Sequence, residues 1–146
     1  ELVKKQLPYF QKAGIKIIAG SDAAALNTYV YPAESLIDEL MIFNEAGLTP
    51  LEILQAATVN GARYFDQFDT MGSVAEGKIA DLVLLDKNPL LDIGAVKNIF
   101  AVIRKGRHYN RAALDGMLTK AQQTKISLDL ERKWVFSKDK VKMGVN

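Results

Sequence analysis

Asp22 is the titratable residue whose position in the sequence most suggests chemistry. It follows a short β-branched run, Ile15-Lys16-Ile17-Ile18-Ala19, through the polar turn Gly20-Ser21. In parallel α/β proteins the carboxyl end of a buried strand is where catalytic and ligand-binding groups lie. A carboxylate there can bind a metal ion or accept a proton from metal-bound water. The alternative is a turn or N-cap aspartate that accepts hydrogen bonds from local backbone amides. Spacing alone favours this second role without excluding the first.

The other polar residues offer less chemistry. His108 is the single histidine of a sequence that contains no cysteine, whereas a zinc site usually takes three or four protein ligands. It follows a predicted hairpin turn, so we expect a strand residue rather than a ligand. A nucleophile triad cannot be built, and no glycine-rich phosphate loop is present. Solvated or structural roles are also the simplest expectation for the acidic residues Glu34, Asp38, Glu39, Glu76 and Asp81.

The composition indicates a folded chain and excludes several classes of protein. Of the 146 residues, 49% are hydrophobic and 25% are charged, which excludes collagen, a coiled-coil rod and a wholly disordered chain. No apolar run reaches the roughly 18 residues of a membrane-spanning helix. The net charge of +2 is too small to indicate a nucleic-acid partner, and the basic tail around Trp134 and Phe136 contains interspersed acids. The length is also too short for a complete (β/α)₈ barrel, which takes about 250 residues.

The predicted secondary structure changes from helical to strand-rich near residues 69–73. Before this point, Pro8 should break or delay a first helix that Gly14 ends, and the run over 15–19 reads as a strand buried on both faces. Thr49-Pro50-Leu51-Glu52 has the pattern of a capping box at a helix start. The remaining expected elements are a helix over 33–46, a short helix after Thr58 that turns Phe65 inward, a strand over 80–85, a hairpin of 99–104 and 107–109, and a helix over 111–123.

Several short blocks of sequence between residues 14 and 109 form a recognisable series. The most specific is the run from Gly72 to Asp86, which has the form G-S-x-x-x-G-K-x-A-D-L-V-x-L-D. The others are residues 19–23, Glu39-Leu40, residues 44–50, the A-A-T-x-N-x-A segment over 56–62, and Asn88-Pro89-Leu90. In this order they resemble the C-terminal part of the metal-dependent amidohydrolase superfamily, most closely its imidazolonepropionase-like and Xaa-Pro dipeptidase-like branch.

The resemblance implies an α/β fold made of parts of two domains. Residues 1–70 would be the C-terminal end of a (β/α)₈ barrel, with residues 16–19 as its last strand and Asp22 at the carboxyl end of that strand. Residues 71–110 would be strands of a small composite β-sandwich. Residues 111–146 would be a C-terminal helix and a tail of unknown role. The chain begins at Glu1 without an initiator Met, which fits a processed or engineered terminus as well as a piece of a longer protein.

The resemblance also implies a metal-dependent hydrolase of C–N bonds in amides, cyclic amides or dipeptide-like small molecules. Asp22 would be a metal ligand and the general base, and the divalent metal would most simply be zinc. The family's H-x-H pair and its further Lys and His ligands match nothing in this sequence. The histidine that many relatives carry after the last strand is also absent from residues 29–37. We therefore expect the 146-residue chain alone to bind no catalytic metal and to be inactive.

Two expectations about partners follow. The parent enzyme would act on a small-molecule substrate and would bind neither nucleic acid nor a membrane. This chain would self-associate, or would contact the missing N-terminal part, through open strand edges and apolar helix faces. The alternative is a non-catalytic association module derived from the same fold. The sequence does not indicate a compartment, since the absence of cysteine suits either side of a membrane.

Overall fold

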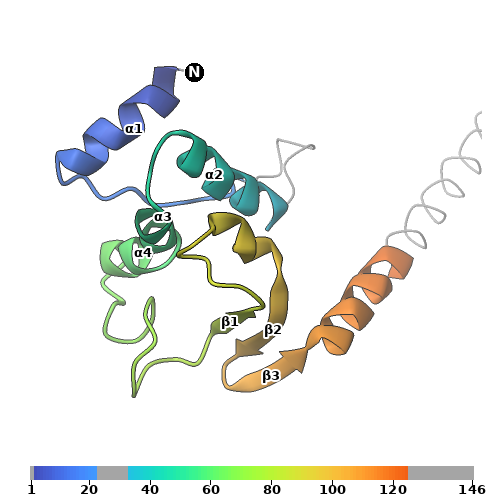
Figure 1. Ribbon diagram of the computed structural model, residues 1–146. Helices are drawn as coiled ribbons and strands as arrows, with labels where there is room; N and C mark the ends of the chain where they lie inside the picture. Colours follow the sequence, from blue (N-terminus) through green and yellow to red (C-terminus); the bar gives the residue numbers. More distant parts are fainter. Residues whose placement is uncertain (1, 23–32, 125–146) are drawn as a thin grey trace, which may run out of the picture. The chain divides into compact units, whose positions relative to one another are not determined.

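The computed structural model describes residues 2–22 and 33–124 and divides into two compact units, residues 1–108 and 109–146 (Figure 1). The first unit contains α1 (Leu2–Lys12), α2 (Glu34–Glu45), α3 (Pro50–Ala57), α4 (Val59–Tyr64), β1 (Leu82–Leu85), the 3-10 helix η1 (Ile93–Lys97) and β2 (Ile99–Arg104). The strand β3 (Arg107–Asn110) crosses the boundary between the units, and a helix over residues 111–124 follows it. Among these described helices, none has the length and apolar character that crossing a membrane requires.

Glycine ends both α1 and α2 with the same motif. Gly14 and Gly47 have φ angles of +79° and +95°. The N–H groups of Gly14 and Ile15 donate to carbonyls of the last turn of α1, and those of Gly47 and Leu48 do the same in α2. This is the Schellman pattern, which favours glycine because it needs a left-handed residue just after the helix. The predicted helix ends are confirmed, whereas the predicted break at Pro8 is wrong because α1 continues through it.

The core of the first unit forms where α2, α3 and η1 meet. A capping box starts α3 as predicted: Thr49 Oγ1 accepts a hydrogen bond from Glu52 N, and Glu52 Oε2 accepts one of 2.8 Å from Thr49 N. Ile53, in α3, and Ile93, in η1, are fully buried and form the centre of this core. The cluster of buried residues consists of Leu40, Phe43, Leu48, Ile53, Ala56 and Ile93. The inward placement predicted for Phe65 is wrong, since this side chain is 69% exposed.

The segment over residues 15–19 is not a strand in this structure. It runs without regular secondary structure between α1 and Asp22, and the N–H of Ala19 donates to the carbonyl of Ala56 in α3 at 3.0 Å. A strand needs a neighbouring strand to satisfy its backbone groups. In the described part of the chain the strands are those of one sheet, ordered β1-β2-β3, and none of them pairs with this segment. The β-branched pattern predicted a strand that these residues have no partner to form.

The sheet is antiparallel between β1 and β2, with Val83 opposite Val102 and Leu84 opposite Ala101. Lys105 and Gly106 both have positive φ angles, of 49° and 77°, as the two-residue turn of a tight hairpin requires. The hairpin predicted from the sequence is confirmed, and the strand predicted over 80–85 is observed as β1. A second sheet that would complete a sandwich is not seen among the described residues.

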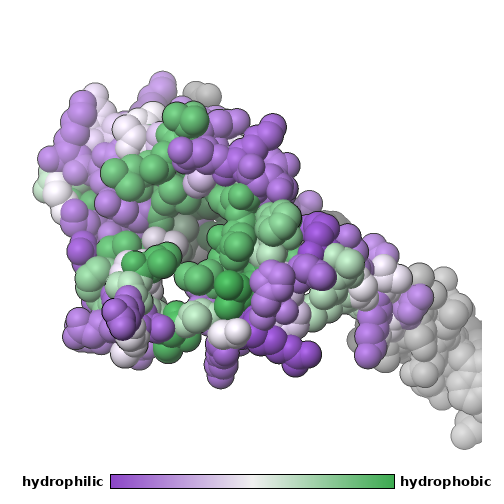
Figure 2. Space-filling view, turned by 60° about the horizontal axis from the view of Figure 1, so that its bottom comes forward, coloured by the Kyte–Doolittle hydropathy of each residue, from purple (hydrophilic) through white to green (hydrophobic). Residues whose placement is uncertain are grey.

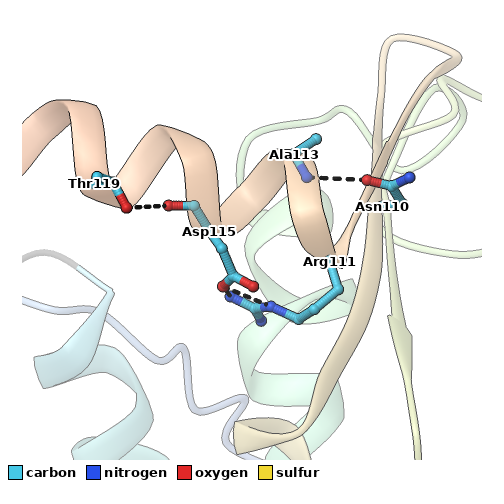
Figure 3. A network of polar contacts seen from close by, with 5 residues as sticks. All are labelled: Asn110, Arg111, Ala113, Asp115 and Thr119. Atoms are coloured by element: carbon cyan, nitrogen blue, oxygen red, sulfur yellow. Dashed lines mark hydrogen bonds and ion pairs between the residues drawn. The ribbon is translucent and has the colours of Figure 1, made fainter.

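Side-chain contacts stabilise the first turns of the helix over residues 111–124 in the second unit (Figure 3). Asn110 Oδ1 accepts a hydrogen bond of 2.9 Å from Ala113 N, which caps the helix. Arg111 and Asp115 form an i,i+4 ion pair, with 2.9 Å between Arg111 Nε and Asp115 Oδ1. The predicted helix over 111–123 is therefore confirmed.

Candidate functional site

The segment that leads to Asp22 is hydrogen-bonded to α3 and α4. The side-chain amide of Asn60, in α4, donates a hydrogen bond of 2.8 Å to the carbonyl oxygen of Ile17. Asn60 is buried and polar, and this bond satisfies a group that would otherwise be costly to bury. Together with the bond from Ala19 N to Ala56 O, it holds the segment against α3 and α4. The backbone before Asp22 is thus positioned without strand pairing.

Glu39, in α2, makes a third connection to this segment. Its Oε2 accepts a hydrogen bond of 2.6 Å from the backbone N–H of Gly20. Burial raises the pKa of the Glu39 carboxyl, the Gly20 hydrogen bond lowers it in part, and the negative charge of Asp22 raises it further. Glu39 is only partly exposed, so the solvated role expected from the sequence is wrong. The helix pattern could not reveal this, because the partner lies 19 residues earlier in the chain.

Asp22 itself is exposed and has a φ angle of 45°. This left-handed conformation is uncommon for residues with a side chain, although aspartate tolerates it better than most. The hydrogen bond from Gly20 N to Glu39 Oε2 ties α2 to the backbone two residues before Asp22. Within residues 2–22 and 33–124 there is no group of three or more His, Cys, Asp or Glu side chains arranged to hold a metal ion. Asp22 therefore offers oxygen donors suited to a divalent cation but only part of a ligand set.

The remaining candidates lie away from this segment in the chain. Asp81 has the structural role expected of it, because its Oδ1 accepts a hydrogen bond of 2.6 Å from Lys105 N at the hairpin turn. His108 is exposed on β3, and Glu34, Asp38 and Glu76 are also exposed. Trp134 and Phe136 lie outside the described residues, as do residues 29–32.

A cation-centred cluster that sequence reasoning missed organises residues 68–78. The ammonium group of Lys78 donates to the carbonyl oxygen of Phe68 and to Ser73 Oγ, the latter at 2.9 Å. It also lies 3.8 Å from the centroid of the Phe68 ring, and Arg63 lies 4.7 Å from the same centroid. The available signal was the Gly77-Lys78 pair inside the most specific sequence block. These contacts close the loop on itself, which gives Lys78 a structural role.

Comparison with known proteins gives a consistent result over most of the chain. Residues 5–124 match the model of the Amidohydrolase family. Imidazolonepropionase of a Geobacillus species is 35% identical in an alignment of 107 residues, and the match covers 63% of this chain and 25% of that protein. Ochratoxinase of Aspergillus niger is 38% identical over 84 residues, 56% of this chain and 16% of that protein.

A solved structure shares the fold of the same region. The crystal structure of a Xaa-Pro dipeptidase with bound methionine superposes with a TM-score of 0.64 and 29% sequence identity. The match covers 74% of this chain and 25% of the dipeptidase chain. The 146 residues thus span a quarter or less of the length of these three proteins.

Proposed function

Because the chain belongs to the amidohydrolase family, we propose that it is the C-terminal part of a metal-dependent hydrolase that cleaves C–N bonds. The observation that carries this proposal is the placement of Asp22: residues 17–20 accept a hydrogen bond from α4 and donate one each to α3 and α2, and Asp22 follows in an exposed position. A backbone held in place before an exposed carboxylate is what a metal ligand requires. The family match over residues 5–124 supports the same assignment.

In this proposal Asp22 has two roles. A bound divalent ion, which we take to be zinc, supplies Lewis acidity that lowers the pKa of a water molecule toward neutrality. The carboxylate of Asp22 would contribute an oxygen ligand to the ion. It would also accept the proton that the water gives up and pass it to the leaving nitrogen of the substrate, as a general base and then a general acid.

The remaining metal ligands would come from residues outside this chain. One aspartate and a distant histidine cannot make the three or more protein ligands that a catalytic zinc usually has. We therefore propose that the 146-residue chain alone binds no catalytic metal and is inactive, and that activity belongs to a longer protein. Two of its relatives are named for substrates of modest size, as imidazolonepropionase and Xaa-Pro dipeptidase. A small amide, cyclic amide or dipeptide-like molecule is the substrate class that we propose.

The proposed architecture follows from the same premise. Residues 1–70 would be the end of the barrel, with residues 16–19 forming its last strand once a neighbouring strand is present. Residues 71–110 would be strands of a composite sandwich, and residues 111–146 a helix and tail without an assigned role. Exposed apolar residues support this incomplete packing: Figure 2 shows hydrophobic side chains gathered on one face of the first unit. Ile15 and Ile18 are 54% and 41% exposed, which favours self-association or contact with a preceding segment.

Metal analysis of the longer protein tests the proposal. Asp22→Asn should lower both its metal content and its hydrolysis of amide substrates, because an amide is a weaker ligand than a carboxylate and cannot accept the proton. Glu45→Gln is the control, since Glu45 is an exposed carboxylate paired with Lys4 at 2.7 Å. Full metal content and activity in Asp22→Asn would overturn the proposal. A start codon immediately before Glu1 would instead support the alternative of a non-catalytic association module. An in-frame H-x-H pair encoded upstream of Glu1 would support the enzyme.

A further inference from the structure

The three hydrogen bonds that hold residues 17–20 depend on the sequence in different ways. The bond between Ala19 and Ala56 joins two backbone groups and survives any substitution that leaves the helices in place. The other two need particular side chains, namely Asn60 on Ile17 and Glu39 on Gly20. The Glu39 bond lies two residues before Asp22, so it acts directly on the turn that carries the Asp22 carboxylate.

The chemistry of the Glu39 contact makes it a strong anchor. A carboxylate that accepts from a backbone N–H forms a charge-assisted bond, which is shorter and stronger than a neutral one. The distance of 2.6 Å between Glu39 Oε2 and Gly20 N agrees with such a bond.

The conformation of Asp22 shows why the turn needs an anchor. Its φ angle of 45° lies in the left-handed region, which is unfavourable for most residues with a side chain, although aspartate tolerates it better than most. Such a conformation persists only where the surrounding structure holds it. The bond from Gly20 N to Glu39 Oε2 holds the backbone two residues before Asp22.

We propose that Glu39 is a positioning residue: by accepting the hydrogen bond of the Gly20 amide it fixes the turn from which Asp22 reaches the metal ion. This inference rests on the proposed function, in which Asp22 is a ligand. Glu39 itself does not touch the metal ion or the substrate in this role. Glutamine keeps an acceptor oxygen and can form a neutral, weaker form of this bond, whereas methionine has no such acceptor, so glutamine should replace glutamate far better than methionine does.

The hydrogen bond can be observed in the 146-residue chain without any metal. Labelling alanine with carbonyl ¹³C and glycine with ¹⁵N selects three Ala–Gly amides, those of Gly14, Gly20 and Gly47. Glu39→Met should shift the Gly20 amide proton upfield, because the carboxylate acceptor is lost, and should leave Gly14 and Gly47 in place. Glu45→Met, the same change in the same helix, should leave Gly14 and Gly20 in place and shift only Gly47, which lies two residues from the substitution. An unmoved Gly20 resonance in Glu39→Met, with the other two also unmoved, would overturn the proposal.

Metal affinity of the longer protein tests the positioning role itself. Glu39→Met should weaken metal binding about 10-fold to 100-fold, the range typical of residues that orient a ligand. Glu39→Gln should restore most of this loss, and Glu45→Met should cause none. The measurement is metal content after competition with a chelator, which does not depend on turnover. Folding is checked by the Gly14 and Gly47 amides, which report the ends of α1 and α2.

Asp22→Asn, measured in the same competition, separates the two proposals. If it binds metal as tightly as the wild-type protein, Asp22 is not a ligand and the proposed function fails. If Asp22→Asn loses metal while Glu39→Met behaves like Glu45→Met, the proposed function stands and only the role of Glu39 is overturned. A loss in Glu39→Gln as large as in Glu39→Met would also contradict the acceptor mechanism.

Discussion

The side-chain amide of Asn60 donates a hydrogen bond of 2.8 Å to the carbonyl oxygen of Ile17, 43 residues earlier in the chain. This bond links α4 to the segment that leads to Asp22. Asn60 is a buried polar residue, and no buried polar side-chain atom among the described residues lacks a hydrogen-bond partner. A satisfied buried amide of this kind fixes one arrangement of the two segments.

Removing the Asn60 amide should destabilise the fold. Asn60→Ala leaves the Ile17 carbonyl without its donor, and an unsatisfied buried group costs about 1–3 kcal/mol. We expect a decrease of this size in the free energy of unfolding, measured by urea denaturation. Asn44→Ala, at an exposed position of α2, should change it by less than about 0.5 kcal/mol. Equal effects of the two substitutions would mean that the Asn60 bond contributes nothing specific.

Replacing Lys78 should loosen residues 68–78. Lys78→Met removes the hydrogen bonds to Phe68 O and Ser73 Oγ and the contact with the Phe68 ring. Hydrogen bonds from a charged donor are worth about 1.5–3 kcal/mol where they are partly buried. We expect faster proteolytic cleavage within this segment and a lower free energy of unfolding. Lys87→Met, at an exposed lysine, serves as the control and should leave the cleavage rate unchanged.

The capping box of α3 should make stability depend on pH in a defined direction. Hydrogen bonds from the backbone and side chain of Thr49 lower the pKa of Glu52 below its ordinary value of 4.5. The stabilising contribution of the Glu52 carboxylate is therefore fully present above pH 4.5 and is lost as the pH falls through the lower, folded-state pKa. The difference in free energy of unfolding between the wild type and Glu52→Gln should shrink over this interval. A difference that stayed constant down to about pH 3 would contradict the assignment.

Exposed apolar residues on the sheet should drive self-association of the chain. Val83 and Phe100 are 58% and 57% exposed. Val83 lies in β1, and Phe100 lies in β2 at the irregularity between the Leu84–Ala101 and Leu85–Ile99 pairs. Sedimentation should therefore show oligomers of the wild-type chain, and Phe100→Lys should shift the distribution toward monomer. Arg104→Lys, which keeps the charge at an exposed site of β2, should not. A folded wild-type chain that stays monomeric would argue against this expectation.

The family could be predicted from the sequence because its blocks are short and ordered along the chain. The run from Gly72 to Asp86 contains turn glycines, the residues of β1 and Lys78, which donates hydrogen bonds to Phe68 O and Ser73 Oγ. Each of these roles depends on residue type at a fixed spacing. The match of residues 5–124 to the Amidohydrolase family confirms the resemblance. The role of Asp22 remains a prediction, since its partners in a metal site would lie outside the chain.

Contacts between distant residues escaped prediction for a physical reason. A helix face that is exposed to solvent and one that is covered by a loop can both carry polar residues. The sequence therefore predicts a solvated Glu39, although its side chain accepts a hydrogen bond from Gly20. Its partner, Gly20, is a backbone amide that carries no sequence signal of its own. Likewise, the apolar pattern over 15–19 reports a tendency toward extended backbone, but a strand forms only where another strand supplies hydrogen bonds.

The sequence by itself determined the local structure: where Gly14 and Gly47 end helices, where the Thr49–Glu52 box starts one, and where Lys105-Gly106 turns the hairpin. These features depend on groups only a few residues apart, so local residue types decide them. Only the tertiary structure decided how the segment before Asp22 is held. Asn60 and Glu39 hold this segment from positions 43 and 19 residues away from their partners. Only the folded arrangement of the helices brings such groups within hydrogen-bond distance.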